Sequence, residues 1–332
     1  MTPDSFKALI SRTSPSGFIS PAIEKVPFSI LPENEVLIKV KLSSLNYKDA
    51  LSASGKNNVT RNYPHIPGID ASGTVISDTS GQFKSGQEVI VTGNDLGTNT
   101  FGGFGEYIRV PADWVVALPD SLTPEQAMIS GTAGFTAAYG IERLIRELIT
   151  PEKGKILVTG ASGGVGSFAI FMLSQLGYSV TAMTGKSEQH DFLKSLGAGN
   201  ILSRNEFLGA SKSPLLPRKW AGAIETVGGE ILDIALRQTE NDGAVACCGN
   251  ILSQTLETSV YPFILRGVSL LGISSALCPK SIRLNIWKTI SELDFKKLPY
   301  NYYRTIGLEQ LPNEIEKILN GKQVGRIVVR HS

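Results

Sequence analysis

The order of apolar and polar residues divides the chain into parts with different periods. The first part consists of short apolar runs separated by glycine, proline and asparagine, which is typical of β-strands joined by turns. Residues 35–42 mix apolar and charged side chains as a half-buried strand does. Further short strands are predicted at residues 72–76, 88–91, 106–110 and 114–118. This part of the chain is therefore expected to be rich in β-structure.

From Pro124 onward, strands and helices alternate. Thr123 and Pro124 have the residue types of a helix N-cap and a first helical position, and Gly177 ends an apolar helix predicted at residues 168–176. The other predicted elements are helices at residues 187–196 and 231–238 and strands at residues 156–158, 178–183, 200–203, 223–226, 244–248 and 269–273. This alternation predicts a parallel, doubly wound α/β sheet.

The pattern changes again after residue 276. The predicted elements are a helix that contains Trp287 and Ile290, an aromatic loop at residues 300–303, a helix at residues 311–320 and a strand at residues 326–329. A chain of 332 residues exceeds the size at which one core usually stops growing, so two domains are expected. We predict a discontinuous β-rich domain and, inserted in it, a nucleotide-binding domain; their respective boundaries are residues 1–126 with 275–332, and residues 127–274.

A glycine-rich turn joins the first strand of the alternating part to its helix. Gly160, Gly163 and Gly166 permit a tight turn and a close approach of the backbone to a pyrophosphate, while the first N–H groups of the helix face the anion. Strand, turn, helix and second strand fit one βαβ unit, which predicts dinucleotide binding; an ordinary turn is the alternative. The residues expected at the phosphates are Ser162, Gly163, Gly164 and Val165.

The end of the second strand indicates which dinucleotide binds. An NAD site usually places a carboxylate there to bind the ribose 2′-OH, but this strand leads into Thr184, Gly185 and Lys186. Glu188 is close in sequence, but with Ser187 as the predicted N-cap it falls in the first turn of the next helix, where a carboxylate has a structural role. The exit from this strand therefore does not predict an NAD site.

A hydroxyl and a cation at this strand end suit a 2′-phosphate instead. Arg204, which follows the strand at residues 200–203, adds a guanidinium for the same group. Lys186 or Arg204 alone is equally well explained as a solvated surface charge, but together they favour NADPH as the cofactor.

The composition is that of an ordinary globular protein, with 42% hydrophobic and 19% charged residues. The net charge of +2 gives no broad positive surface for nucleic acid. The first residues lack the pattern of a secretory signal, and no uninterrupted apolar run is long enough to span a bilayer. We therefore predict a cytoplasmic enzyme with a small-molecule substrate and with neither a nucleic-acid nor a membrane partner.

Cysteine and histidine are too few and too scattered for a disulfide framework or a metal site. Cys247 and Cys248 follow a strand-like apolar run and Cys278 stands alone, which favours buried small side chains over catalytic thiols. The histidines, none of which has a partner at metal-ligand spacing, are His65, His190 and His331.

A succession of motifs spans nearly the whole chain: Asn46-Tyr47-Lys48-Asp49, Pro-His-Ile-Pro-Gly-Ile-Asp at residues 64–70, Gly-Gly-Phe-Gly-Glu-Tyr at residues 102–107, Gly-Thr-Ala-Gly-Phe-Thr at residues 131–136, the glycine turn and Gly325-Arg326. This set resembles the medium-chain dehydrogenase/reductase superfamily, on its quinone-oxidoreductase-like side. The segments that look like its NADPH-dependent acryloyl-CoA reductase branch are residues 46–50, 68–70, 220–223, 226–228 and 262–267.

The resemblance implies a GroES-like catalytic domain, a Rossmann domain, a cleft between them and a homodimer. It also implies that the segments 249–251 and 272–274 lie near the nicotinamide. The residues that this adds to the expected cofactor site are Gly249, Ile251, Ile273 and Ser274, and Thr132 and Thr136 are expected to line the cleft.

The chain departs from the zinc-dependent relatives at two places. They carry Gly-His-Glu where this chain has Gly68-Ile69-Asp70, and they use an early cysteine and a four-cysteine lobe that are missing here. Both departures exclude alcohol dehydrogenase chemistry, in which zinc polarises an alkoxide. We expect no metal and a reductase of polarised double bonds.

Such a reaction needs an oxyanion donor and a proton source, because hydride transfer to the β-carbon of an enoyl thioester leaves charge on the carbonyl oxygen. Tyr47 is the first candidate, with an O–H group and a flat face for the nicotinamide; a packed cleft aromatic is the alternative role, and water is the alternative proton source. Asn46 is expected to orient the cofactor ribose or the substrate carbonyl. Asp49 is expected to cap a helix that begins near Ala50.

The leading hypothesis is NADPH-dependent reduction of acryloyl-CoA to propanoyl-CoA, or of a similar activated alkene. The phosphates of CoA would need cations, for which the candidates are Lys48, Lys56, Arg61 and Arg304. The alternatives are an NADPH:quinone oxidoreductase and, from another class, a non-catalytic NADPH-binding sensor or structural protein.

Overall fold

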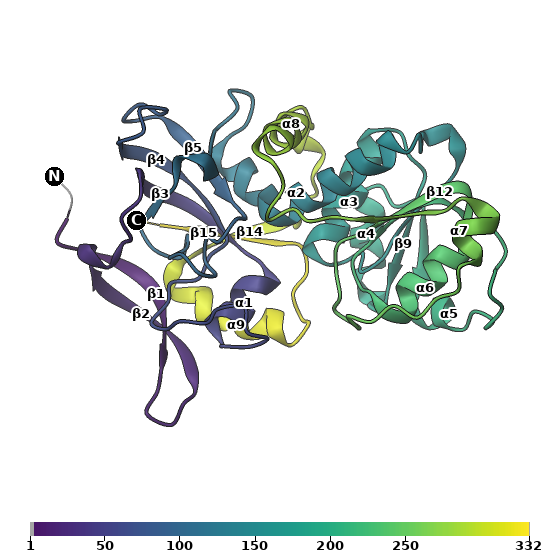
Figure 1. Cartoon of the computed structure of the whole chain (residues 1–332), viewed down its shortest axis with the longest axis horizontal. Coiled ribbons are helices and arrows are strands. Elements are labelled where there is room, and N and C mark those ends of the chain that lie inside the picture. Colours follow the sequence, from purple (N-terminus) through teal and green to yellow (C-terminus); the bar gives the residue numbers. More distant parts are fainter. Residues whose placement is uncertain (1–2, 332) are drawn as a thin grey trace. The chain divides into compact units, whose positions relative to one another are not determined.

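The computed structural model describes residues 3–331, and the chain divides into two compact units. Unit 1 consists of Met1–Thr132, Ala276–Glu292 and Asn301–Ser332, and unit 2 consists of Ala133–Ser275 and Leu293–Tyr300. Each unit has its own sheet and its own hydrophobic core (Figure 1).

Unit 2 is built on a six-stranded parallel sheet with the strand order β10-β9-β8-β11-β12-β13. Its strands are β8 (Ile156–Val158), β9 (Val180–Thr184), β10 (Asn200–Ser203), β11 (Trp220–Glu225), β12 (Thr239–Cys247) and β13 (Ser269–Gly272). The strand order reverses between β8 and β11, which is the switch point of a doubly wound sheet. The predicted parallel, doubly wound sheet is confirmed.

Short helices connect these strands, as the teal and green ribbons of Figure 1 show. They are α3 (Gly164–Gln175), α4 (His190–Ser195), α5 (Arg204–Leu208), α6 (Gly229–Gln238) and α7 (Tyr261–Arg266), with 3-10 turns η3 (Pro151–Lys153), η4 (Ser187–Gln189) and η5 (Phe295–Lys297). One core of the unit lies between the sheet and α6 and includes Leu157, Trp220 and Ile231. Helix α3 also buries apolar side chains, among them Phe168 and Ile170.

Unit 1 contains a seven-stranded sheet in which β14-β15-β3-β4-β5-β7 are neighbours and β6 pairs with β3. Its strands are β3 (Val36–Leu45), β4 (Asp70–Asp78), β5 (Glu88–Thr92), β6 (Tyr107–Val110), β7 (Val115–Ala117), β14 (Tyr303–Gly307) and β15 (Arg326–Arg330). The pairs are antiparallel except for β14 with β15. The first part of the chain is thus rich in β-structure, as its pattern predicts.

The helices of unit 1 are few, and two of them, α1 and α9, pack against each other (Figure 1). They are α1 (Tyr47–Ala53), α8 (Lys280–Ser291) and α9 (Leu311–Leu319), with 3-10 turns η1 (Phe28–Ile30), η2 (Ala112–Trp114) and η6 (Leu308–Gln310). Helix α2 (Pro124–Arg146) begins in unit 1 and contains the boundary between the units.

A hairpin of β1 (Ser5–Thr13) and β2 (Ile19–Pro27) was not predicted from the sequence. Strand β2 alternates between half-buried and exposed residues with one shift at Glu24, but within it Val26 alone is buried, so its apolar pattern is weak. The hairpin forms because Phe6, Ala8 and Leu9 of β1 are buried in the core of unit 1.

Two predicted helix starts were wrong. Helix α1 begins at Tyr47 rather than near Ala50, and its N-cap is Asn46 rather than Asp49. The segment 187–196 is a 3-10 turn followed by α4, and Ser187 lies inside the turn rather than at its N-cap. In addition, α3 starts four residues earlier than predicted, α7 was not predicted, and residue 303 belongs to a strand instead of a loop.

Candidate active site

The glycine turn lies at the carboxyl end of the central strand of unit 2. Gly164 and Val165 open α3, so their N–H groups have no acceptor within the helix. Gly160 has a φ of +56°, and a Cβ there would lie 2.3 Å from Thr226 Oγ1. A Cβ on Gly166 would lie 2.6 Å from the carbonyl oxygen of Gly160. The glycines thus let the helix start directly against the strand end, with N–H groups available to an anion.

The predicted cofactor residues of unit 2 gather along one edge of the sheet, because the carboxyl ends of parallel strands meet there. They are Ser162, Gly163, Gly164 and Val165 after β8, Thr184, Gly185 and Lys186 at the end of β9, Arg204 after β10, Gly249 and Ile251 after β12, and Ile273 and Ser274 after β13. Thr136, on α2, is tied to the segment after β13 by a hydrogen bond between its Oγ1 and Ser275 Oγ (2.7 Å).

Two cations lie together at the ends of the paired strands β9 and β10. A Cβ on Gly185 would lie 3.1 Å from Arg204 Cζ, so the guanidinium lies over the glycine. The Lys186 N–H donates to Thr184 Oγ1 (3.1 Å) and fixes the turn after β9. Burial lowers the pKa of the Lys186 ammonium, Arg204 adds to this shift and Glu188 opposes it. Such a pair of cations suits a dianionic group such as a phosphate monoester.

A buried carboxyl group, that of Glu225, holds two loops of this edge together. Its Oε1 accepts hydrogen bonds from the N–H groups of Val227 (2.7 Å) and Gly228 (2.9 Å) and from Thr159 Oγ1 (3.0 Å). Burial raises the pKa of Glu225. Sequence reasoning missed this residue, although an acidic side chain at the end of a strand that is otherwise apolar was a usable signal.

The cysteines near this edge are held as thiols. Cys247 and Cys248 are half-buried rather than buried as predicted, whereas Cys278 is buried. The Cys247 Sγ lies 3.6 Å from Glu225 Oε2. Burial, and then Glu225, raise the pKa of Cys247 to about 11 and also raise that of Cys248. A raised thiol pKa disfavours nucleophilic chemistry at neutral pH.

In unit 1, Tyr47 is the first residue of α1, and 42% of its surface is exposed. The residue before it, Asn46, is buried. Asp49 follows at the third helical position, where its carboxyl group accepts hydrogen bonds from the N–H groups of Asn46 and Ile69, each at 2.7 Å. The phenol of Tyr47 is therefore exposed, while Asn46 and Asp49 on either side of it are buried and hydrogen-bonded.

Asn46 and Asp49 belong to a polar group that we call the Asp70 cluster, formed by the buried residues Ser44, Asn46, Asp49, Asp70 and Arg326 and the half-buried Thr132. Asp70 opens β4 and is fully buried. Its Oδ2 accepts from Ser44 Oγ (2.6 Å), Asn46 Nδ2 (2.7 Å) and the Thr132 N–H (2.9 Å). Its Oδ1 accepts from Thr132 Oγ1. The carboxylate is thereby saturated with donors.

Arg326, at the start of β15, is the cation of the Asp70 cluster. Its Nη2 lies 3.9 Å from Asp70 Oδ2 and donates to Ser44 Oγ (3.1 Å). Its Nη1 donates to Asn46 Oδ1 (3.1 Å), and its Nε donates to the carbonyl oxygen of Ile129 (3.0 Å). Sequence reasoning quoted Asp70 and Arg326 only as parts of motifs and missed that they meet.

Helix α2 is interrupted where it passes the Asp70 cluster. Gly131 has φ +51° and ψ −157°, and a Cβ there would lie 2.4 Å from Asp70 Oδ2 and 2.7 Å from Arg326 Nη2. The break turns the next N–H group, that of Thr132, toward Asp70. Thr132, expected at the cofactor cleft, thus has its N–H and hydroxyl groups bonded to Asp70.

The four cations considered for CoA differ in their surroundings. Within residues 3–331, the side chains of Lys48, Lys56 and Arg61 are exposed and have no ion pair or hydrogen bond. Arg304, in contrast, forms an ion pair with Glu314 of α9. The first three are therefore better placed to accept a new anion.

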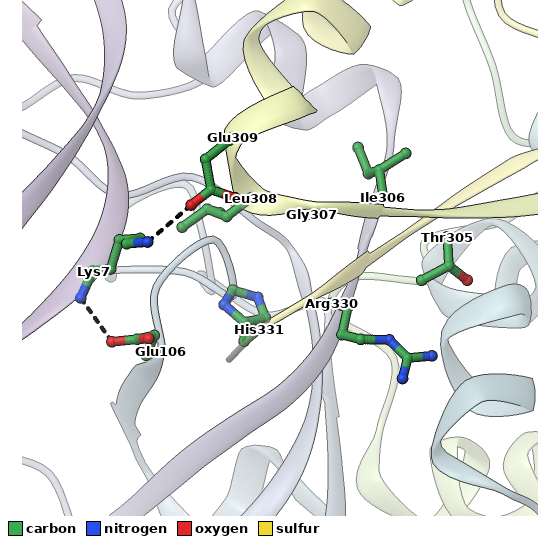
Figure 2. Close-up of a pocket in the computed structure, with 9 residues that line it drawn as sticks. All are labelled: Lys7, Glu106, Thr305, Ile306, Gly307, Leu308, Glu309, Arg330 and His331. Atoms are coloured by element: carbon green, nitrogen blue, oxygen red, sulfur yellow. Dashed lines mark hydrogen bonds and ion pairs between the residues drawn. The ribbon is translucent and has the colours of Figure 1, made fainter.

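A surface cavity of about 600 Å³ occurs elsewhere in unit 1 (Figure 2). It is lined by the ion pair of Lys7 and Glu309, by Glu106, which accepts from the Lys7 N–H, and by Arg330 and His331. Burial lowers the pKa of His331 to about 4, so this ring is neutral at pH 7. The cavity includes none of the predicted site residues, and its charges compensate one another.

Comparison with known proteins identifies the class of protein. Residues 32–120 match the family described as the alcohol dehydrogenase GroES-like domain, and residues 164–291 match the family described as zinc-binding dehydrogenase. The chain belongs to the medium-chain dehydrogenase/reductase superfamily, as its motifs indicated, and the predicted combination of a GroES-like and a Rossmann domain is confirmed.

Within this superfamily, the chain is similar to relatives with two kinds of name. It is 44% identical to the probable acrylyl-CoA reductase AcuI of Escherichia coli over 313 residues, which cover 93% of this chain and 95% of the relative. It is 43% identical to the putative quinone oxidoreductase YhfP of Bacillus subtilis, over 94% of this chain and 95% of the relative.

Solved structures show the same likeness. The yhdH oxidoreductase from Salmonella enterica in complex with NADP has a TM-score of 0.95 and 42% identity, covering 98% of this chain and all of that chain, 100%. The Bacillus subtilis protein yhfP with NAD bound has a TM-score of 0.95 and 42% identity, and the match covers 99% of this chain and 100% of that chain.

The zinc in the family's name does not fit the residues of this chain. Structural and catalytic zinc sites use cysteine, histidine and carboxylate ligands. The Asp70 cluster has no cysteine or histidine, and both oxygens of Asp70 accept hydrogen bonds, with the Arg326 guanidinium as the neighbouring cation. Among the described residues, no group of three histidine, cysteine or acidic side chains is placed to hold a metal ion, and no helix is long and apolar enough to cross a membrane.

Proposed function

We propose that this protein is an NADPH-dependent reductase of carbon–carbon double bonds conjugated to a carbonyl group, with acryloyl-CoA or a similar enoyl thioester as substrate. The observation that carries this proposal is the exposed phenol of Tyr47 beside the Asp70 cluster, whose side chains bond to one another and do not suit a metal ion. The name acrylyl-CoA reductase, given to relatives 41% and 44% identical over nearly the whole chain, supports the substrate class.

NADPH, when bound, supplies the hydride for this reaction. The N–H groups at the start of α3 would hold its pyrophosphate, because they lack acceptors in the helix. Lys186 and Arg204 would hold the 2′-phosphate, with the hydroxyl of Thr184 beside them. The remaining residues proposed to line the cofactor site are Ser162, Gly163, Gly164, Val165, Thr136, Gly185, Gly249, Ile251, Ile273 and Ser274.

The residues of unit 1 would serve the substrate side. When a hydride adds to the β-carbon, the electron pair of the double bond moves toward the carbonyl oxygen, and the α-carbon then takes one proton. The Tyr47 hydroxyl is proposed to donate a hydrogen bond to that oxygen or the proton to the α-carbon; water is the alternative proton source. Product and substrate differ by one hydride and one proton, so no other reactant is required.

The thioester hypothesis predicts a role for exposed cations. Lys48, Lys56 and Arg61 lie on or just after α1, the helix that carries Tyr47, and their side chains are unpaired within the described residues. They are proposed to attract the phosphates of CoA, whereas Arg304 already neutralises Glu314. A quinone would need none of these charges.

Two other functions remain distinct candidates. Quinone reduction is supported by the name of the Bacillus subtilis relative. A non-catalytic NADPH-binding protein would keep the cation pair at β9 and β10 but would have no use for the exposed phenol of Tyr47.

The experiment is to follow NADPH and NADH absorbance with the purified protein and three acceptors: acryloyl-CoA, crotonyl-CoA and a benzoquinone. We expect turnover of NADPH with the enoyl thioesters. Strong turnover with the quinone alone would reject the thioester proposal, and NADPH binding without any turnover would favour the non-catalytic protein.

We also propose that two copies of the chain form a homodimer through unit 2. Within residues 3–331, strand β13 pairs with β12 alone and has no strand on its other edge. The exposed apolar side chains of β13 and of α7 with its N-cap, the segment that precedes β13 in the chain, form what we call the β13 face, namely Val260, Tyr261, Ile264, Leu265 and Leu270. An open strand edge beside exposed apolar residues favours pairing with a second copy about a twofold axis.

The two domains are proposed to have separate roles. We propose that residues 1–126 and 275–332 form the catalytic domain and residues 127–274 the NADPH-binding domain. A cytoplasmic location is part of this proposal.

A further inference from the structure

Both polar atoms of the Asn46 side chain are already engaged by neighbouring side chains. An asparagine side chain offers two N–H groups and one carbonyl oxygen. The Nδ2 atom donates to Asp70 Oδ2 (2.7 Å) and lies 3.3 Å from Asp49 Oδ2, and the Oδ1 atom accepts from Arg326 Nη1 (3.1 Å). Only 8% of the residue is exposed. A direct bond from Nδ2 to cofactor or substrate would require breaking one of these contacts, and a ligand donor would have to reach the second lone pair of the buried Oδ1 beside Arg326.

The same amide bridges the two carboxyl groups of the Asp70 cluster. Asp70 belongs to β4 and is held by donors from β3 and α2, so it is fixed to the sheet of unit 1. Asp49 belongs to α1 and is held to the segment before β4 through the Ile69 N–H. Asn46 lies between them and thereby links the first turn of α1 to the sheet.

Tyr47 directly follows this link. Its own side chain is partly exposed, so packing alone holds it loosely. The backbone that carries it is fixed on the preceding side by the Asn46 amide and inside the helix by the bond from the Asn46 N–H to Asp49 (2.7 Å). The direction in which the phenol leaves the protein is thus set by Asn46.

We propose that Asn46 is a positioning residue for Tyr47 and does not itself touch the substrate or the cofactor. This inference rests on the proposed function and on Tyr47 as its donor. Displacements of about 1 Å at a reacting group can cost about 100-fold in rate, so loss of the link is expected to lower kcat. The binding of NADPH is expected to change little, because the cofactor residues of unit 2 are not altered.

The test is a double-mutant cycle with Asn46→Ala and Tyr47→Phe, measured as kcat with acryloyl-CoA and as the Kd of NADPH. We expect Asn46→Ala to lower kcat by about 10- to 100-fold in the native background and by less than about twofold when Tyr47 is already Phe. Equal losses in both backgrounds would mean that Asn46 acts on its own and would overturn the proposal. A normal kcat in folded Asn46→Ala would overturn it as well.

A matched control is Ser43→Ala in β3, the strand that ends just before Asn46. It removes a buried hydrogen bond to His331 Nε2 (3.1 Å) that lies outside the Asp70 cluster. It is expected to lower stability without the kcat loss of Asn46→Ala. If Asn46→Ala does not fold, Asn46→Ser replaces it in the same cycle.

Hydrogen–deuterium exchange gives a readout that does not depend on activity. In Asn46→Ala, or in Asn46→Ser where that variant replaces it, the N–H groups of Asp49 and Ala50, which donate to the Asn46 carbonyl oxygen, should exchange faster. The amides of α9 should not change in this variant, and in Ser43→Ala the amides of α1 should keep their native exchange rates. Unchanged exchange in α1 would refute the positioning role. If the native enzyme reduces no alkene, the proposed function fails, and the exchange data still decide whether Asn46 fixes α1.

Discussion

Lys186 and Arg204 are the residues on which the cofactor assignment depends. Their juxtaposition at the ends of β9 and β10 places two positive charges where a 2′-phosphate would lie. A charge-assisted hydrogen bond is worth about 1.5–3 kcal/mol, so either alanine substitution should raise the Kd of NADPH by about 10- to 100-fold. The Kd of NADH should change by less than about threefold, which a fluorescence titration would measure.

The control for this pair is Lys194→Ala, which removes an exposed lysine of α4 in the same unit. It should leave both affinities unchanged. Equal losses of NADPH and NADH affinity in the Lys186 and Arg204 variants would defeat the 2′-phosphate assignment.

Asp49 gives the fold a pH dependence. Burial, and then the neighbouring carboxylate of Asp70, raise the pKa of Asp49 to about 7, although the hydrogen bonds from Asn46 and from the Ile69 N–H oppose this shift. The unfolded side chain titrates near about 3.9. Between these values the folded protein keeps a proton that the unfolded chain has lost, so this group contributes stability at low pH that is lost as the pH rises toward 7.

The free energy of unfolding should therefore carry a negative contribution from Asp49 of up to about 1.4 kcal/mol per pH unit between about pH 4 and pH 7. Urea titrations across this range would measure it. The variant Asp49→Asn should lack this contribution, so its stability should fall less with pH than that of the native protein; identical slopes would show that Asp49 is already ionised in the folded state.

At the scale of residues, the sequence was most informative where one side chain has one function. The glycine turn, Lys186 and Arg204 could be read from their order along the chain. The Asp70 cluster could not, because its members are separated by up to 282 residues and meet only when β3, β4, α2 and β15 pack together. For the same reason the sequence could not show that the Asn46 amide bonds to Asp70 and Arg326.

Helix α2 owes its break to a single residue. Gly131 adopts φ +51°, and a Cβ there would lie 2.4 Å from Asp70 Oδ2 and 2.5 Å from Ser44 Oγ. Gly131→Ala adds both backbone strain and a clash with a buried carboxylate, so it should cost about 2–4 kcal/mol of stability. Thermal and urea unfolding would measure the loss.

The matched control is Gly81→Ala, because Gly81 has φ +74° but a Cβ there would have no heavy atom within 4 Å. It carries the strain without the clash and should cost only about 1 kcal/mol. Similar losses of stability at the two glycines would mean that the Asp70 cluster rearranges to accommodate a methyl group at position 131.

Elements were predictable where their period was regular. The alternating strands and helices of unit 2 follow from apolar runs of the right length, and β10 was predicted with its observed bounds. The hairpin β1–β2 was missed because β2 buries a single residue, Val26, and its alternation shifts at Glu24. The start of α1 was misplaced because Asn46 and Asp49 both suit an N-cap, and the choice between them is made by Asp70 and Ile69, which are distant in sequence.

For the molecule as a whole, the β13 face predicts the oligomeric state. Leu265→Glu or Ile264→Glu places a charge among exposed apolar side chains, where burial against a second copy would be costly. We expect the native protein to sediment as a dimer and both variants as monomers. Phe18→Glu, at an exposed apolar residue of unit 1 that is outside this face, is the control and should remain dimeric. A native monomer at micromolar concentration would contradict the proposed interface.

The pattern predicted a β-rich part and an alternating part of the chain, and both are found. The predicted bounds of the two domains stay a proposal, and residues 293–300, predicted in the catalytic domain, belong to unit 2. The substrate could not be predicted from the sequence, because binding sites for CoA thioesters and for quinones differ in only a few exposed positive charges. Lys48, Lys56 and Arg61 are such charges, and their meaning depends on a ligand that sequence patterns do not describe.

The most direct test of the central claim is the fate of hydrogen isotopes in the reduction of acryloyl-CoA. NADPH deuterated at the transferable C4 position should give propanoyl-CoA with one deuterium on the β-carbon, and unlabelled NADPH in D₂O should give one deuterium on the α-carbon. Mass spectrometry and proton NMR of the product would locate both. Absence of propanoyl-CoA, or deuterium from NADPH on the α-carbon, would contradict hydride transfer to the β-carbon of an enoyl thioester.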